Sequence, residues 1–338
     1  VAVCGLWPSA VTDAAAASMS HVAWDGFAHH DTIFPLFLFI AGVSFPYSVA
    51  KQRAGGMSEG RIYAKIVRRG LTLVVLGMVY NGLFKLDFEN LRIASVLGRI
   101  GLAWSIAAVL YLNFGVKTRA AIAVAVLAGY GALSALVAAP DAAGAGPLTF
   151  EGNLAGYIDR QFLPGKLIYG SFDPEGLLST VPAVVTAMLG MFTGEFVRRG
   201  DIRGGRKTLW MAAAAAALLA AGLAFSGVLP VNKKLWSSTF VCVVGAYSLG
   251  MFALFYYLID VRGWRRWTLF FRVVGLNSIT IYLAQRIVGF GRISDFFLGG
   301  IASKCPEAVA AVISSAGYVA VCWLFLYFLY RKNVFLKV

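Results

Sequence analysis

Residues 31–50 read DTIFPLFLFIAGVSFPYSVA and form a continuous apolar run that decides the fold class. About 20 residues of α-helix cross the hydrocarbon core of a bilayer, at 1.5 Å per residue. Because lipid offers no water to backbone N–H and C=O groups, a run of this kind is helical. The stretch therefore predicts a membrane-spanning helix, and Pro35 and Pro46 predict bends in it.

Similar apolar runs recur along the rest of the chain. We predict spans near 31–50, 70–84, 93–113, 119–139, 176–197, 208–229, 236–259, 268–290 and 308–330. The second span is short, and we expect it to extend into the basic segment before it. Residues 1–17 have the composition of the end of an earlier helix, which gives nine to ten spans in all. The prediction is an all-α, polytopic transmembrane helix bundle, with residues 1–338 as a single domain.

The composition supports this fold class. Of the 338 residues, 59% are hydrophobic and only 14% are charged, whereas soluble domains have roughly 45–50% apolar and about 25% charged residues. A cytosolic enzyme, a disordered tail and a coiled coil are thereby excluded. The four cysteines are far apart and match neither a disulfide framework nor a metal-ligand spacing.

The net charge of +14 would favour a nucleic-acid partner in a soluble protein, but the placement of the charges indicates a membrane topology instead. One set of alternating loops carries 19 Lys and Arg against 3 acids, and the other carries 9 against 12. The first set comprises 51–69, 113–119, 198–207, 260–266 and 331–338, and the second comprises 1–31, 85–92, 140–175, 230–235 and 285–307. The positive-inside rule makes the first set, and the C-terminus, cytoplasmic. The predicted partner is the lipid bilayer, with no nucleic acid.

All three histidines lie in the segment before the first span, on the predicted extracytoplasmic side. His21 precedes Trp24, and His29 and His30 directly precede Asp31. Histidine is a natural general base near neutral pH, and a nearby carboxylate orients it and stabilises its charged form. Solvated loop histidines remain an alternative, as does helix capping by the aspartate. The spacing fits no helical H-x-x-x-H motif, so we predict no metal.

Polar side chains inside or beside the spans are further candidates. Arg99 lies within a span, where an arginine faces a cavity, an anion or a carboxylate, or else extends to the interface. Asn277 lies mid-span and suits hydrogen bonding between helices. Among the cytoplasmic arginines, most fit topology or lipid headgroups, while a few suit a phosphate-binding mouth. Those considered for phosphate include Arg68, Arg69 and Arg265.

The outer loop 140–175 contributes four more charged candidates. Asp159 and Arg160 belong to a structured-looking NLAGYIDRQFLPG, and Asp173 and Glu175 immediately precede a span. Capping of the helix that follows is the alternative for at least one of the last two.

Six motifs in order resemble the heparan-α-glucosaminide N-acetyltransferase family, and its bacterial branch in particular. They are HVAWDG with DTIFPLFLFIAGVS, LRIASVLGRIGL, AGYIDR, DPEGLLSTVPAVVTAMLGMFTGE, KLWSSTFV and GLNSITIYL, and they cover residues 21 to about 285. The resemblance implies a membrane acyltransferase that moves acetyl from cytoplasmic acetyl-CoA to an extracytoplasmic acceptor, an amino sugar or glycan. It also implies the bacterial inner (cytoplasmic) membrane as the location.

The resemblance implies roles for individual residues. The family's active-site histidine falls on His21, its Asp and Asn positions fall on Asp31 and Asn277, and the R-I-x-x-V-L-x-R arginines fall on Arg92 and Arg99. Catalytic roles are therefore expected for His21, Asp31 and Asn277, acetyl-CoA binding for Arg99, Arg68, Arg69 and Arg265, and acceptor contacts for Trp24, Asp159, Arg160, Asp173 and Glu175.

The chain also departs from the family pattern. An arginine-bearing first helix with the pattern L-x-x-L-R-G is absent, so we expect a truncated first helix. Gly98 replaces a glutamine of the relatives, and Ala284-Gln285 replaces a glycine-histidine pair. These differences leave the acceptor unassigned.

Two other functions are compatible with the same polar residues. A transporter or flippase for a glycan or lipid precursor would use them without covalent chemistry, although the two related halves with matching broken helices that many transporters have are not evident. A non-catalytic membrane scaffold would use the histidine segment only for capping and would not bind acetyl-CoA. A homodimer remains open.

Overall fold

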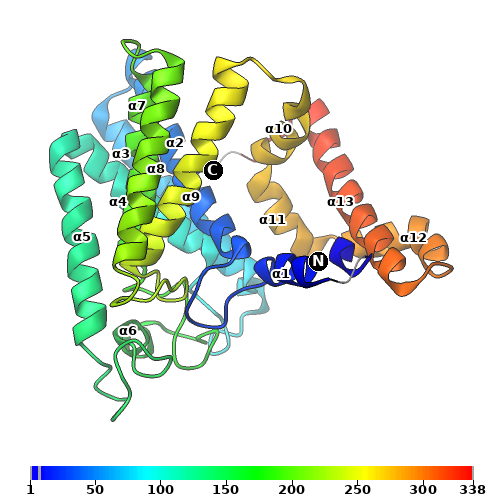
Figure 1. Ribbon diagram of the computed structural model, residues 1–338, viewed down its shortest axis with the longest axis horizontal. Helices are drawn as coiled ribbons and strands as arrows, with labels where there is room; N and C mark the ends of the chain where they lie inside the picture. The colour runs from blue at the N-terminus through cyan, green and yellow to red at the C-terminus, as the bar shows by residue number, and fades with distance from the viewer. Residues whose placement is uncertain (1, 7–8, 337–338) are drawn as a thin grey trace. The chain divides into compact units, whose positions relative to one another are not determined.

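The computed structural model describes residues 2–6 and 9–336, and the regular elements within these ranges are all helical (Figure 1). Seven helices are long and apolar enough to cross a membrane, and one bent pair raises the number to eight at most. The all-α prediction is confirmed, and the chain is an integral membrane protein with several spans.

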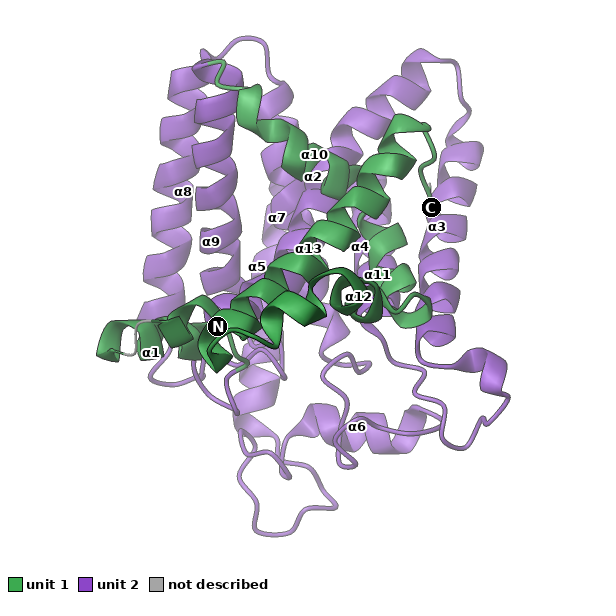
Figure 2. Ribbon diagram, turned by 90° about the vertical axis from the view of Figure 1, so that its right-hand side faces the viewer, with its two compact units in different colours: residues 1–21, 263–338 green, residues 22–262 purple. Residues whose placement is uncertain are grey.

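The chain forms two compact units, which Figure 2 colours separately. We call residues 22–262 the central unit, and residues 1–21 with 263–338 the terminal unit. The single domain over 1–338 stays a prediction.

The central unit is a helix bundle with α7 at its centre. Its helices are α2 (Ile33–Ala54), α3 (Glu59–Tyr80), α4 (Val96–Asn113), α5 (Val116–Leu136), α6 (Leu154–Phe162), α7 (Thr180–Arg198), α8 (Gly204–Ala224) and α9 (Ser238–Tyr256), with short helical turns at His29–Thr32, Leu83–Lys85 and Tyr257–Val261. Helix α7 contacts α2, α4, α5 and α9. It is also the most buried of the seven candidate spans, which explains why its sequence is apolar nearly all round.

Helices α2 and α7 approach each other unusually closely because glycines face the contact. A Cβ at Gly190 would lie 2.0 Å from the Phe39 carbonyl oxygen, and a Cβ at Gly42 would lie 2.2 Å from that of Ala187. Small residues at such contacts let backbones approach in membranes, where close packing rather than water exclusion holds helices together. The contact fixes the start of α2, and with it the segment before that helix.

Most predicted spans coincide with helices, and the differences have physical causes. Helix α3 begins at Glu59, so the expected extension into the basic segment is confirmed, and α3 is not among the seven apolar spans. Helix α2 is continuous through Pro46, while Pro35 falls in its first turn, where a missing N–H leaves no hydrogen bond unmade.

The terminal unit contains η1 (Ala2–Leu6), α1 (Ala10–Ser18), η5 (Arg266–Thr268), α10 (Leu269–Leu276), α11 (Ser278–Ile287), α12 (Phe290–Ala302) and α13 (Glu307–Arg331). The span expected at 268–290 is a broken pair, because Arg266–Leu276 and Ser278–Ile287 meet at 59° on either side of Asn277. Helix α12 lies in a segment expected to be a loop. Of the predicted helix end at 1–17, residues 1, 7 and 8 lie outside the described ranges, and the others form η1 and α1.

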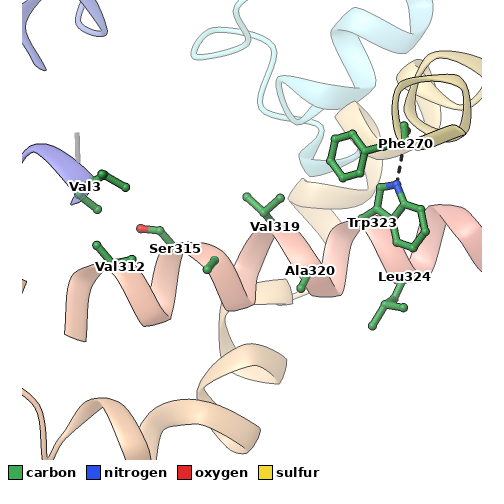
Figure 3. Close-up of a pocket in the computed structure, with 10 residues that line it drawn as sticks. Val3, Phe270, Val312, Ser315, Val319, Ala320, Trp323 and Leu324 are labelled. Atoms are coloured by element: carbon green, nitrogen blue, oxygen red, sulfur yellow. Dashed lines mark hydrogen bonds between the residues drawn. The ribbon is translucent and has the colours of Figure 1, made fainter. Parts of the chain in front are cut away.

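Helix α13 carries an apolar groove within the terminal unit. Val3, Val319 and Leu324 line it with Phe270 and Trp323, whose indole Nε1 donates to the Phe270 carbonyl at 3.4 Å (Figure 3). Much of α13 is exposed, as is usual for a helix that faces lipid.

Candidate functional site

Most of the predicted site residues gather at one end of the central unit. At this end α2, α4, α7 and α9 begin and α6 lies among the connecting loops (Figure 1). We call it the α6 end, and the opposite end, which carries the basic loops, the basic end.

Asp31 is 2% exposed and lies in the helical turn that leads into α2. Its Oδ1 forms an ion pair with the Lys233 ammonium at 3.1 Å, and its Oδ2 accepts a hydrogen bond from the Val22 N–H at 3.5 Å. Val22 is the residue that follows His21 in the chain. The N-cap of α2 is Thr32, so Asp31 is not the cap residue of that helix.

Arg92 joins two of the predicted acceptor-binding carboxylates. Its Nε and Nη2 donate to the two oxygens of Asp173, each at 2.6 Å, and Nη2 also donates to Glu175. Although burial alone would lower the pKa of Arg92, these ion pairs raise it above its ordinary value. The N-cap position of α7 is Ser179, whose side chain makes no capping hydrogen bond, so neither Asp173 nor Glu175 is the cap residue of this helix.

Asp159 is fully buried on α6 and has no cationic partner at hydrogen-bond distance in the described structure. Its Oδ2 accepts from the Asp173 N–H at 3.2 Å and its Oδ1 accepts from the Leu177 N–H at 2.9 Å. Burial raises the pKa of this carboxyl to about 6, against the lowering effect of the two N–H groups. Asp159 thus shapes the turn that carries Asp173 and Glu175.

Arg99 lies in the first turns of α4 and is 2% exposed, so it does not extend to the interface. Its Nη2 donates to the Ser179 hydroxyl and to the Gly176 carbonyl, the latter at 3.4 Å. Its Cζ lies 5.0 Å from the centroid of the Trp236 ring. Nε and Nη1 are buried and have no hydrogen-bond partner among the described residues. A buried guanidinium with two unused donors is suited to an anion or a developing oxyanion.

Trp24 anchors the histidine-bearing segment to the outer loop. Its Nε1 donates to the Leu148 carbonyl at 2.9 Å, and its ring packs edge-on against Phe172 and at a tilt against Phe150. Arg160 holds the same loop, through a bidentate ion pair with Asp141. Both contacts hold the outer loop in place at the α6 end.

The arginines expected to bind the donor do not form one cluster. Arg68 is one of the residues that line an apolar groove on α3. The Arg69 guanidinium lies over the Trp104 ring, 4.3 Å from its centroid, and its buried Nε has no partner in the described structure. Arg265 belongs to the terminal unit. A separate ion pair, between the buried Arg119 and the half-buried Glu195 at 2.6 Å, links α5 and α7 near the basic end.

Two predicted catalytic residues, His21 and Asn277, also belong to the terminal unit. Asn277 is 2% exposed, its Nδ2 donates to the Val334 carbonyl at 3.2 Å, and its Oδ1 accepts from the Thr280 hydroxyl at 3.1 Å. These contacts hold the break between α10 and α11. The catalytic roles of His21 and Asn277 stay predictions.

Sequence reasoning missed Lys233, Ser179 and Trp236. Lys233 counted only as a loop charge, and Trp236 only as part of the KLWSSTFV motif. That motif was the available signal, because it directly follows Asn232 and Lys233, but nothing in it shows which side chains it faces.

The fold and the site together define a class of protein: a polytopic helical membrane protein. At one end it has buried carboxylates in ion pairs and a buried arginine whose Nε and Nη1 have no hydrogen-bond partner among the described residues. Residues 6–224 match the family model described as heparan-alpha-glucosaminide N-acetyltransferase, catalytic. The chain belongs to this family.

Curated relatives extend the match over nearly the whole chain. The Homo sapiens heparan-alpha-glucosaminide N-acetyltransferase is 27% identical over 375 residues, which cover 94% of this chain and 55% of the human protein. The Mus musculus protein of the same name is 26% identical over 372 residues, with 94% and 56% covered. The chain thus spans about half the length of the curated relatives it matches.

Proposed function

We propose that this protein is an acetyltransferase that moves acetyl from cytoplasmic acetyl-CoA to an acceptor on the extracytoplasmic side, an amino sugar or another glycan. Family membership supports the reaction class. Among the structural observations, the buried Arg99 with two unused donors carries the proposal furthest. The basic end would then be cytoplasmic, in a bacterial inner membrane, with the C-terminus on the same side.

Acyl transfer develops negative charge on the acetyl carbonyl oxygen, and preorganised donors at that oxygen lower the barrier. Arg99 has such donors, its Nε and Nη1, and both atoms are buried. Its Nη2 contacts the Gly176 carbonyl, in the turn that carries Asp173 and Glu175. In the proposed reaction Arg99 receives this oxygen. Arg92 holds the two carboxylates in place, and they accept hydrogen bonds from the hydroxyl or amine groups of the acceptor.

His21 is the proposed base. It removes a proton from the acceptor amine or hydroxyl, whose nitrogen or oxygen bonds to the acetyl carbon while the carbon–sulfur bond breaks and the proton passes to the CoA thiolate. In the covalent alternative, the imidazole accepts the acetyl group first and passes it to the acceptor. Asp31 stabilises the charged imidazole in the first route, and Asn277 keeps the catalytic role that the family resemblance implies.

The basic end is chemically suited to the phosphates of acetyl-CoA. Arg69 has a buried nitrogen that lacks a partner within the described residues, as expected of a guanidinium that awaits an anion. Arg68 and Arg265, each within its own unit, are the further proposed phosphate ligands. Acetyl-CoA supplies the activated thioester, and the protein's own residues bind it and position the acetyl carbon.

The test uses purified protein in nanodiscs with radiolabelled acetyl-CoA, with glucosamine present or absent. We expect CoA release that requires glucosamine, and a decrease of about 100-fold or more in His21→Ala. His29→Ala is the matched control, since His29 contacts Tyr247, and it should stay near the wild-type rate. Label that remains on the wild-type protein without acceptor, and is absent from His21→Ala, would identify the covalent route.

A folded His21→Ala protein with full transfer would contradict the assignment of the base. If folded wild-type protein binds acetyl-CoA but releases no CoA, glucosamine is the wrong acceptor. Absence of acetyl-CoA binding would contradict the acetyltransferase itself and favour transport of a glycan or lipid precursor.

A further inference from the structure

We propose that the connection between α8 and α9, residues 230–237, is a positioning element of the catalytic centre, and that Lys233 is the residue in it that holds Asp31 for the reaction. The inference rests on the proposed function for the reaction concerned, and on contacts within the central unit for the geometry.

Residues 230–237 are held in one conformation by their own hydrogen bonds. The Ser237 hydroxyl donates to the Pro230 carbonyl at 2.7 Å and accepts from the Asn232 N–H at 3.0 Å, while the Asn232 side-chain oxygen accepts from the Leu235 N–H at 2.9 Å. Trp236 has a positive φ of 52°, a conformation that non-glycine residues seldom adopt. Such a conformation persists only where the surroundings enforce it.

This connection contacts the segment that carries His21 and Trp24 at two places. The Gly26 N–H donates to the Val231 carbonyl at 3.0 Å, and the Lys234 ammonium donates to the Ala23 carbonyl at 2.5 Å. Lys234 also lies over the Tyr169 ring, at 4.5 Å from its centroid, and so reaches the outer loop. The contacts fix the backbone on both sides of Trp24.

Trp236 extends the connection to the proposed oxyanion site. Its ring is 1% exposed, packs edge-on against Phe34 at the start of α2, and lies beneath the Arg99 guanidinium. Its Nε1 donates to the Thr186 hydroxyl of α7 at 3.2 Å. One connection of eight residues therefore contacts the elements that carry Asp31, Arg99 and Trp24.

The Lys233–Asp31 ion pair is the contact with a direct chemical consequence. The carboxylate is 2% exposed, and a buried charge without a partner is strongly unfavourable. The other cation of this connection, Lys234, donates to the Ala23 carbonyl and also attracts Asp31 electrostatically, but the ion pair at 3.1 Å is with Lys233. Because Lys233 engages Oδ1, it directs Oδ2 toward Val22, next to His21 in the sequence. Lys233 thus acts through Asp31 and is a positioning residue.

Lys233→Ala, Lys233→Arg and Lys166→Ala form the test set. Lys166 is an exposed lysine at the same end whose backbone N–H donates to the Leu91 carbonyl, so its replacement controls for lost charge. We expect Lys233→Ala to lower kcat by up to about 100-fold with little change in KM for acetyl-CoA. Lys233→Arg should recover most of the rate, and Lys166→Ala should match the wild type.

Chemical rescue separates a positioning charge from mere packing. Ethylammonium added to Lys233→Ala supplies an ammonium group small enough for the space that the removed side chain leaves. We expect it to raise the kcat of Lys233→Ala at least tenfold while leaving the kcat of the wild type and of Lys166→Ala unchanged. Unchanged kcat in Lys233→Ala, or a loss that neither arginine nor ethylammonium reverses in a normally folded protein, would overturn the proposal.

A thermal-unfolding cycle of Asp31→Asn, Lys233→Ala and the double variant needs no activity. If the ion pair stabilises Asp31, the decrease in melting temperature of the double variant is smaller than the sum of the decreases in the two single variants. Additive losses would overturn the proposal. If the wild type is inactive but the losses in the cycle are not additive, the acetyltransferase function is refuted while the stabilisation of Asp31 by Lys233 is established. The failure of the proposed function and the failure of this inference are therefore distinguishable.

Discussion

Three buried carboxylates at the α6 end each have a different kind of partner. Asp173 is paired with Arg92, Asp31 with Lys233, and Asp159 with backbone N–H groups alone. A cationic partner stabilises the ionised form of a buried carboxylate. A buried carboxylate that is bonded only to neutral N–H donors is less stable as an anion, because burial favours the neutral acid. Of the three, Asp159 is the carboxyl whose pKa burial raises.

Asp159 predicts a pH dependence of stability. Its pKa is about 6 in the folded protein against an ordinary value of 3.8, so the folded state favours the neutral acid. The resulting stabilisation is complete below the ordinary value and is lost as the pH rises through about 6. Between about pH 4 and about pH 7, the melting temperature of the wild type should fall relative to that of Asp159→Asn, which cannot ionise.

The two proteins share every other titrating group, so their difference isolates Asp159. Asn keeps one acceptor oxygen for two N–H donors, and we expect the variant to be less stable than the wild type at low pH. A difference that stays constant, or grows in favour of the wild type as the pH rises, would contradict the proposed state of Asp159.

At the scale of elements, the contact between α2 and α7 is the most sensitive to added volume. Gly190→Ala places a methyl group 2.0 Å from a backbone oxygen of α2, which only a separation of the helices relieves. We expect the free energy of unfolding to fall by about 1–3 kcal/mol. Because α2 carries Asp31 at its start, kcat should fall as well. Thermal unfolding in detergent and the acetyl-CoA assay measure the two effects.

Gly129→Ala is the control for this change. Gly129 lies within α5, and a Cβ there would meet nothing within 4 Å. Alanine is the better helix former, so the control should be as stable as the wild type or slightly more stable. Equal stability of both variants would show that α2 and α7 are farther apart than described.

Helices were the most predictable elements, and their interruptions were the least. Hydropathy located α2, α4, α7 and α13 well, because a span must be apolar over its whole length. It gave no sign of the 59° break at Asn277, since apolar residues continue on both sides of it. The asparagine appeared as a mid-span polar residue, but its bond to the Val334 carbonyl is a tertiary contact.

The candidate site was predictable as a set of residues but not as a network. Sequence reasoning selected Arg99 because a charge within a membrane span is costly. It selected Asp31 because this carboxylate lies beside the histidines, and Asp173 because it is a charged residue of the outer loop directly before a span. It did not pair Asp31 with Lys233, because a loop lysine is ordinarily a solvated charge. Pairing depends on which loops meet at one end, and periodicity carries no such information.

For the whole molecule, the distribution of charge predicts the orientation in the membrane. The cytoplasmic assignment of the basic end is checked in a cysteine-free background with Lys85→Cys at the α6 end and Gly200→Cys at the basic end, both exposed. A membrane-impermeant maleimide should label intact inner-membrane vesicles of right-side-out orientation at position 85 only. Labelling at position 200 alone would show that the topology is opposite to the predicted one. It would also contradict the sidedness of the proposed reaction.

The contact between Lys234 and Ala23 joins residues 211 positions apart, and this separation bears on biosynthesis. Chains emerge from the ribosome at about 5–20 residues per second, N-terminal part first. The segment around Trp24 is therefore inserted many seconds before the connection that fixes it exists. During this interval Asp31 has no Lys233 beside it, and the α6 end stays unassembled until α8 has crossed the bilayer.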